Sequence, residues 1–485
     1  MILADLPPLA LAGLAILIAA FGVIAGLWIA RRTNWAPAGG LAILVATPLI
    51  PFVPVLGGLS LDDVLPLVGI AFLATAVDLR RLWTVRAPRL LLIGLILAVA
   101  AGILSSLVNA SSPGQALTML LRSPGRYAYL AVIVVLVALA EPADRRRTLV
   151  ARSMALLGTA EAIFGLAAFF LPLGGIGLEP TRRFSVLYFE VPGRIAGTLG
   201  ISPNFLGAIF ILTITLTAGL AIDARGGRER TLLWASVLTQ TLALTLTFTR
   251  ASLGLAIVAL AVLLLVRGRI RYLLPVLCVV AIGFATTPAR APVPGTPGTP
   301  GTPASQGPLV PVAIERLTSD VPDRLALWYS ASLMMLDHPL TGVGPGRMVE
   351  VAHGNPDRYI DTPVGPATNS AHNTVLLAGA EAGIVAAIGA LLVNVALSLL
   401  ALRVVLSPRR RRLPAIETAG ALAVLGYLAQ GMVNNLFNVA ACGVVFAVVA
   451  GAYVVLLNPE PSPEPSFDEA QRQRAPTGPP VELAL

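Results

Sequence analysis

Apolar runs of roughly 15 to 30 residues recur along nearly the whole chain, and most are long enough to cross a hydrocarbon core of ~30 Å as an α-helix. Within each run the apolar residues are continuous rather than alternating, which excludes a membrane β-barrel. With 56% hydrophobic residues, 12% charged residues and a mean hydropathy of +0.83, the composition also differs from that of a soluble domain. The sequence therefore predicts a polytopic all-α integral membrane protein.

Arginine supplies all 34 basic residues, and its distribution predicts the orientation of the chain in the membrane. After the first cluster, the clusters recur at every second apolar run, at 31–32, 80–89, 145–152, 225–230, 267–271 and 403–412. Such an alternation is the positive-inside pattern of cytoplasmic loops. Nucleic-acid binding, the usual alternative for a chain of net charge +9, needs a continuous basic stripe that these short clusters do not form.

Spans placed between the clusters predict about 12 to 13 membrane helices, with the N-terminus outside and the C-terminus inside. Their approximate ranges are 8–30, 37–56, 64–78, 90–108, 124–140, 149–171, 199–222, 231–248, 252–266, 272–286, 372–402, 415–434 and 438–457. We therefore expect an N-terminal membrane bundle of about ten helices in residues 1–286, an extracytoplasmic loop at 287–371, and C-terminal membrane helices at 372–457. A disordered cytoplasmic tail is expected at 458–485. The first run is too long for a cleaved signal peptide and has no basic residue before it.

The long loop has two unlike halves. Residues 291–303 form a Pro/Gly/Thr-rich spacer with almost no apolar content. The second half predicts a helix from Asp323 to Leu336, with Trp328 at its middle, lying along the membrane interface. The following run, 341–347, is rich in glycine, but a nucleotide-binding loop needs a strand before it and a helix after it. We expect instead a tight turn around Gly344 that brings backbone close to the site.

His372 is the candidate general base. We expect it in the first turn of its helix, with Asn369 or Ser370 as the cap, where the helix dipole disfavours protonated imidazole. Neutral imidazole can accept a proton from a hydroxyl, although a plain helix-end residue is the alternative. Glu381 lies ~13 Å further along the helix, too deep to orient His372 directly, and Gly383 is expected to admit a neighbouring helix.

Three arginines are expected where membrane or interfacial helices meet the outer face: Arg194, Arg250 and Arg324. Arginine suits a diphosphate because its planar fork donates two parallel hydrogen bonds and stays charged. Snorkelling of each side chain to a lipid headgroup is the alternative for any one of them. The three histidines and the separated Cys278 and Cys442 suggest neither a metal site nor a disulfide.

Several of these residues fall in an ordered series of short motifs. The motifs are Gly193-Arg194, Pro203-Asn204, Thr249-Arg250-Ala-Ser252, Arg324-Leu-Ala-Leu-Trp328, His338-Pro-Leu-Thr-Gly-Val-Gly-Pro-Gly346, Ala371-His-Asn373 and Glu381-Ala-Gly383. In this order they resemble the O-antigen ligase and polymerase superfamily, and the similarity runs from about residue 190 to 440.

The resemblance implies an inverting, metal-independent glycosyltransferase of the GT-C type that uses no cofactor. Such an enzyme would take a glycan from undecaprenyl diphosphate at the outer face of the bacterial cytoplasmic membrane and join it to a hydroxyl of a glycan, lipid or protein acceptor. His372 would be the base. Arg194, Arg250 and Arg324 would bind the donor diphosphate, and the supporting residues would be Asn373, Glu381, Gly383, Trp328 and Gly344. Ligases usually carry leucine where Trp328 stands, so ligase and polymerase both stay open.

Two other classes of protein remain as alternatives. A transporter would need coupled polar residues near the midplane of the membrane, for which Glu161, Gln240 and Glu381 are candidates, but no inverted repeat is evident. A non-catalytic scaffold for envelope assembly would tolerate replacement of His372.

Overall fold

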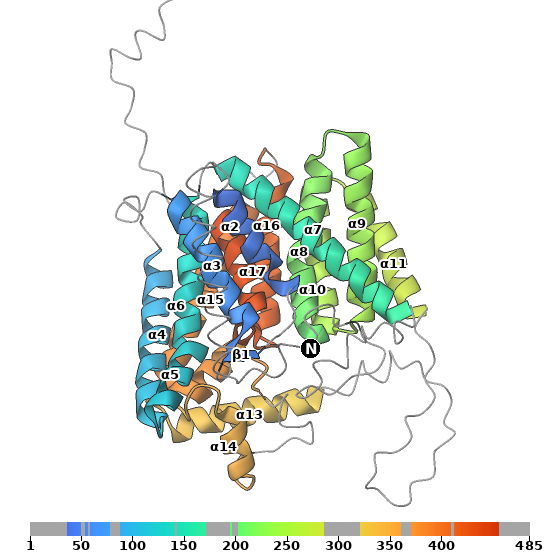
Figure 1. Cartoon of the computed structure of the whole chain (residues 1–485). Helices are drawn as coiled ribbons and strands as arrows, with labels where there is room; N and C mark the ends of the chain where they lie inside the picture. The colour runs from blue at the N-terminus through green and yellow to red at the C-terminus, as the bar shows by residue number, and fades with distance from the viewer. Residues whose placement is uncertain are drawn as a thin grey trace, which may run out of the picture.

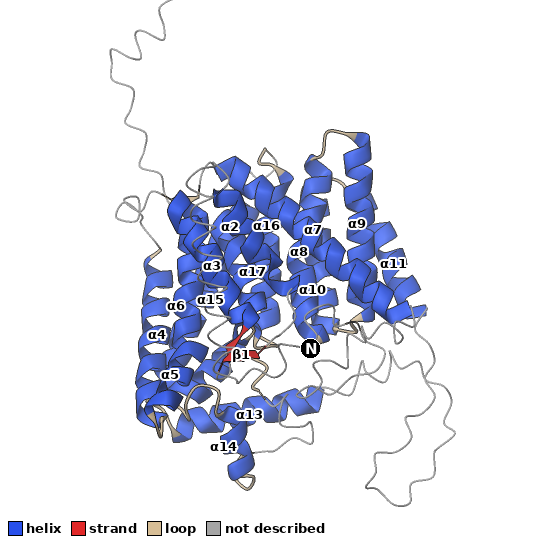
Figure 2. Ribbon diagram, in the orientation of Figure 1, coloured by secondary structure: helices blue, strands red, loops and turns tan. Residues whose placement is uncertain are grey.

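The computed structural model describes residues 36–49, 54–56, 59–77, 88–140, 143–170, 195, 202–285, 321–359, 370–408 and 412–454. Within these ranges the chain is almost wholly helical, and the strands are one short antiparallel pair, β1 (Pro54–Leu56) and β2 (Leu59–Ser60) (Figure 2). Five helical segments there are long and apolar enough to cross a membrane, and the prediction of an all-α multi-pass membrane protein is confirmed.

A helix lies at each predicted membrane span from 37–56 onward. The N-terminal helices are α2 (Ala36–Ala46) with η1 (Thr47–Leu49), α3 (Leu61–Ala76), α4 (Arg89–Asn109), α5 (Pro113–Arg122), α6 (Pro124–Leu139) and α7 (Ala143–Phe170). The next are α8 (Pro203–Asp223), α9 (Gly227–Leu246), α10 (Arg250–Val266), η4 (Ile270–Tyr272) and α11 (Leu273–Ala285). The last are α13 (Val321–Asp337), α14 (Met348–Gly354), α15 (Thr374–Leu406), α16 (Ala415–Gly431), η5 (Leu436–Asn438) and α17 (Ala440–Tyr453). The predicted span 8–30, the spacer 291–303 and the tail 458–485 lie outside the described residues.

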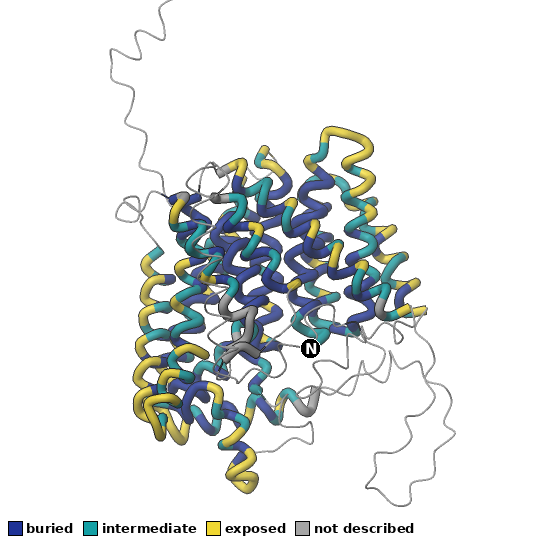
Figure 3. The backbone as a smooth tube through the Cα atoms, viewed as in Figure 1, coloured by how far each residue is buried: buried dark blue, intermediate teal, exposed yellow. Residues whose placement is uncertain are grey.

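The centre of the bundle is formed by α8, α16 and α17, which are buried along most of their length (Figure 3). These helices are apolar all round, as expected for helices surrounded by protein. At the edge, α4 packs closely on α15 where Gly94 and Gly389 face each other: a Cβ at Gly94 would lie 2.9 Å from the Gly389 carbonyl oxygen. Small residues at such a contact let two membrane helices approach backbone to backbone.

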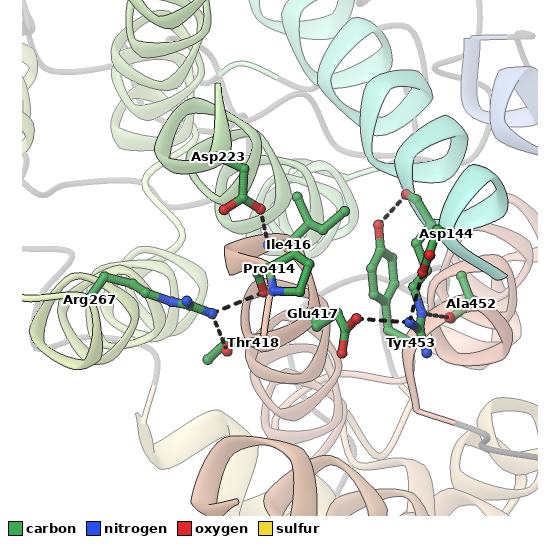
Figure 4. A network of polar contacts seen from close by, with 10 residues as sticks. Asp144, Asp223, Arg267, Pro414, Ile416, Glu417, Thr418, Ala452 and Tyr453 are labelled. Atoms are coloured by element: carbon green, nitrogen blue, oxygen red, sulfur yellow. Dashed lines mark hydrogen bonds and ion pairs between the residues drawn. The ribbon is translucent and has the colours of Figure 1, made fainter. Parts of the chain in front are cut away.

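One end of the bundle is tied together by a polar network around the start of α16 (Figure 4). Asp223, at the end of α8, accepts hydrogen bonds of 2.8 and 3.0 Å from the first two backbone N–H groups of α16. Arg267 donates to the carbonyl oxygens of residues 413 and 414, and Arg147 forms a 2.8 Å ion pair with Glu417. These contacts fix the position at which α16 begins.

The opposite end of the bundle is crossed by α13, which runs across the ends of the long helices (Figure 1). This helix was expected over 323–336 and is found over Val321–Asp337. Near its start, the Nη1 atom of Arg324 donates to the carbonyl oxygen of Val433, just beyond the end of α16. After its last residue, the chain turns into contact with α15 and α4. We call this the α13 end of the bundle.

Candidate functional site

His372 directly precedes Asn373, the residue that caps α15. The Oδ1 atom of Asn373 accepts from the backbone N–H groups of Val375 and Leu376 at 2.9 and 3.0 Å. The prediction that Asn369 or Ser370 is the cap, with His372 inside the first turn, is therefore wrong. His372 instead adopts a φ of +44°, a left-handed conformation that is uncommon outside glycine and concentrates at functional sites.

The imidazole of His372 contacts a residue that the sequence analysis did not select. Its Nδ1 atom lies 3.3 Å from Oδ1 of Asn434, whose side chain is buried. A neutral imidazole that donates Nδ1–H to this amide oxygen keeps a lone pair on Nε2, the state that a general base needs. One feature of the sequence could have pointed to Asn434: the Asn434-Asn435 pair stands between two apolar runs, and polar residues at such positions are often functional.

Asn434 belongs to a five-residue segment that we call the connector: it runs from Gly431, the last residue of α16, to Asn435, the residue before η5. The connector accepts hydrogen bonds from three side chains, two at the start of α15 and one on α13. Asn373 Nδ2 donates to the Met432 carbonyl oxygen at 2.9 Å, Thr374 Oγ1 donates to that of Gly431 at 3.0 Å, and Arg324 Nη1 donates to that of Val433 at 3.3 Å. The connector thus brings two predicted site residues, His372 and Arg324, to adjacent positions of one segment.

Arg250 is the first residue of α10 and lies at the same end of the bundle as the connector. The other end of α10 leads to Arg267, which binds residues at the start of α16. The turn before Arg250 is tight: Phe248 has a φ of +53°, and the hydroxyls of Thr247 and Thr249 lie 2.6 Å apart. Arg250 is therefore held where two membrane helices meet.

Arg194 lies outside the described residues. The next residue, Ile195, donates its backbone N–H to the carbonyl oxygen of Leu246 at 3.1 Å. The chain beside Arg194 is therefore attached to the end of α9, close in sequence to Arg250.

An apolar groove of about 560 Å³ leads along α10, α15 and α16 to the connector. Its residues are Leu255, Val258, Ala259, Val262, Leu391, Asn394, Val395, Ser398, Leu399, Leu422, Leu425, Gly426, Leu428, Ala429 and Met432. Met432 is the connector residue that precedes Val433, the partner of Arg324. The groove therefore ends beside an arginine and close to His372.

Trp328 lies one turn after Arg324 on α13. Its indole N–H is buried and has no hydrogen-bond partner among the described residues. A buried donor of this kind needs an explanation, and a ligand oxygen is one.

The helix α15 is broken at Gly383, where φ is 85° and ψ is 178°. The turn that follows α13 enters this break. The Val343 and Gly344 N–H groups donate to the carbonyl oxygens of Ala380 and Glu381 at 2.9 and 3.0 Å, and the Ile384 N–H donates to that of Pro339 at 2.8 Å. Gly383 was expected to admit a neighbouring helix, and the structure corrects this: a loop backbone inserts there instead.

The break places Glu381 in the wall of a small pocket. Its side chain is buried, and the pocket is also lined by Arg122 and Arg126 from the junction of α5 and α6. Thr374 and Asn435 form the side of the pocket toward the connector. Glu381 is therefore a pocket residue rather than a carboxylate within a continuous helix.

Gln240, a candidate for the transporter alternative, is part of the packing between α8 and α9. Its Oε1 accepts from Thr213 Oγ1 at 2.7 Å, and its Nε2 donates to Thr217 Oγ1 at 3.3 Å. Such contacts join membrane helices. Glu161, on α7, is fully buried.

Comparison with protein families gives a match that begins in α9 and ends within α15. Residues 234–391 match the family model of the O-antigen ligases. The resemblance found in the motifs is thereby confirmed over this part of the chain, and the match supports an O-antigen ligase or polymerase type of membrane glycosyltransferase. The matched range includes the predicted site residues Arg250, Arg324, Trp328, Gly344, His372, Asn373, Glu381 and Gly383. The connector, Arg122 and Arg126 lie outside the matched range. No curated protein matches the chain.

Proposed function

We propose that this protein transfers a glycan from an undecaprenyl-diphosphate-linked donor to an acceptor hydroxyl, at the outer face of the bacterial cytoplasmic membrane. The observation that carries the proposal is the connector, which holds His372 and Arg324 at the end of an apolar groove. The arginine clusters support the orientation. Arg147 and Arg267 lie at the end opposite α13, which is the cytoplasmic end under the positive-inside pattern.

The apolar groove supports a lipid-linked donor. It is lined by the membrane-spanning helices, so a polyprenyl chain in it would stay in an apolar environment while its diphosphate reaches the connector. Arg324 and Arg250 would bind that diphosphate, with Arg194 as a third predicted contact. As the sugar–phosphate bond breaks, negative charge grows on the diphosphate, and fixed guanidinium groups stabilise it.

His372 acts as the base of the reaction. Asn434 holds the Nδ1–H group, and Nε2 accepts the proton of the acceptor hydroxyl. The acceptor oxygen forms a bond to the anomeric carbon while the bond from that carbon to the diphosphate oxygen breaks, and the electron pair leaves with the diphosphate. Attack from the face opposite the leaving group inverts the anomeric configuration. The arginines carry the charge of the leaving group in this step, which needs no metal ion.

The test is transfer by purified protein from a lipid-diphosphate-linked glycan. We expect His372→Ala to lower kcat by about 10²–10⁴-fold, the usual contribution of a general base. His353→Ala is the matched control, because His353 lies exposed on α14. NMR of the product gives its anomeric configuration, and addition of EDTA tests metal dependence. Normal transfer by His372→Ala would remove His372 as the base.

The same assay tests the donor site. Arg250→Gln and Arg324→Gln are expected to raise the KM for the donor, whereas Arg358→Gln leaves it unchanged. Arg358 is exposed and forms an ion pair with Asp337 away from the connector. Equal effects of all three substitutions would indicate diffuse electrostatics instead of a diphosphate site.

A further inference from the structure

A second hollow meets the connector at the end away from the apolar groove. The groove touches the connector at Met432, whereas this pocket touches it at Asn435. By the measure that gives the groove 560 Å³, this pocket has a volume of about 20 Å³, room for little more than a water-sized group, and it opens to the outside. A pocket of this shape would take in the end of a ligand and leave the rest outside.

Three charged side chains line the pocket among apolar ones: Arg122, Arg126 and Glu381. Arg122 is in the last turn of α5 and Arg126 in the first turn of α6, so the junction at Ser123 brings both to one side. Glu381 faces them from α15, and the Gly346 N–H donates to its carboxylate. Two arginines and one carboxylate give the lining a net positive charge. The chemistry suits a ligand with an anionic group, because guanidinium binds phosphate and carboxylate oxygens directly.

The pocket is linked through Thr374 and Asn434 to the imidazole that we propose as the base. Thr374 lines it, and the Thr374 hydroxyl is within hydrogen-bond distance of the Gly431 and Asn434 carbonyl oxygens, at 3.0 and 3.3 Å. The side chain of Asn434 in turn contacts His372. The groove and Arg324 lie toward the start of the connector, the pocket lies at its end, and His372 lies between them.

We propose that this pocket is the acceptor subsite and that the acceptor carries an anionic group, a phosphate or a carboxylate, near the hydroxyl that reacts. Arg122 and Arg126 bind the anion, Glu381 accepts a hydrogen bond from a neighbouring sugar hydroxyl, and the reacting hydroxyl faces His372. The inference rests on the proposed function, and it narrows the acceptor to a phosphorylated or acidic glycan or glycolipid.

The kinetic test compares Arg122→Gln and Arg126→Gln with the wild type. Both positions are at least partly exposed, so the variants are expected to fold. Loss of a charge-assisted hydrogen bond is expected to raise the KM for an acidic acceptor about tenfold or more. The KM for the donor and the kcat at saturating acceptor stay unchanged. Arg358→Gln, at the same end but outside the pocket, is the matched control. A rise in the donor KM would assign the pocket to the donor diphosphate and overturn the inference, as would no change at all.

A binding test separates this inference from the proposed function. Detergent-solubilised wild-type protein is titrated calorimetrically with glucose 6-phosphate, glucuronate, glucose and inorganic phosphate. We expect the two acidic sugars to bind more tightly than glucose, and Arg126→Gln to abolish the difference. That result in a protein without transfer activity would refute the proposed function and leave the pocket standing. Glycan transfer by a protein that binds the acidic sugars no more tightly than glucose would refute the acceptor subsite and leave the proposed function standing. The same titration in nanodiscs with and without anionic lipid tests whether a lipid headgroup occupies the pocket. Weaker binding of the acidic sugars in the presence of anionic lipid would also overturn the acceptor assignment.

Discussion

Replacement of Gly383 by alanine would test whether the inserted turn holds the site together. Gly383 has a φ of 85° and a ψ of 178°, a conformation open to glycine and strained for other residues. A Cβ built there would lie 2.6 Å from the carbonyl oxygen of Pro339 and 2.7 Å from the carbonyl carbon of Leu340. Both neighbours are backbone atoms, which cannot rotate away as the end of a side chain can.

The expected loss of stability has two parts. A side chain forced into such a backbone conformation costs of order 1–3 kcal/mol. The steric conflict with the inserted turn adds about 1–3 kcal/mol, as in other overpacked sites. The free energy of unfolding would therefore fall by about 2–6 kcal/mol. At an unfolding entropy of about 2.1 cal/mol/K per residue, 1 kcal/mol shifts the Tm of a chain of 485 residues by about 1 °C, so we expect the Tm to fall by about 2–6 °C.

The assay is thermal unfolding of purified protein in one detergent, followed by tryptophan fluorescence, together with the transfer rate. Gly254→Ala is the matched control: Gly254 lies within α10, and a Cβ there meets nothing within 4 Å. Alanine is the better helix former by about 1 kcal/mol, so this control keeps or raises the Tm. Transfer by Gly383→Ala would fall with stability, because the displaced turn borders Glu381. Equal Tm values for the two variants would refute the argument that the turn requires glycine at 383.

Two further predictions concern the ends of helices. Asn373→Ala is expected to lower the free energy of unfolding by about 1 kcal/mol, because α15 loses its cap. Asn373→Ser keeps a capping oxygen and serves as the control. Identical Tm values for the two variants would contradict the capping role. The Arg358 hydrogen bond lowers the pKa of Asp337 to about 2 from 3.8, so the ionised carboxylate stabilises the fold above pH 4 and this contribution is lost as the pH falls toward 2. The Tm difference between wild type and Asp337→Asn is therefore expected to be constant above pH 5 and to shrink between about pH 4 and 2. A Tm difference that does not change with pH would exclude the ion pair as its source.

The helices were predictable from sequence because hydrophobicity along a membrane span is a local property. The predicted spans at 90–108 and 272–286 lie within one or two residues of α4 and α11. The start of α15 was misplaced because Asn369, Ser370 and Asn373 can all act as caps, and the local sequence does not choose among them. Asn373 is chosen by a contact distant in sequence, its bond to the Met432 carbonyl oxygen.

The candidate site shows the same division between local and distant information. His372, Arg250 and Arg324 were selected by residue type and motif order, which are local. Asn434 could not be assigned a role, since its contact with His372 requires the end of α16 to fold back onto the start of α15. The position of Glu381 depends on a turn that inserts from outside α15, and only a three-dimensional structure gives that.

The connector has a thermodynamic consequence. Within five residues it touches the proposed donor groove and the proposed acceptor pocket, so a ligand that shifts the end of α16 changes both sites. Coupling of this kind is reciprocal: the factor by which donor binding changes the affinity for acceptor equals the factor by which acceptor binding changes the affinity for donor. The two substrates would then bind cooperatively through the connector, in addition to any direct contact between them.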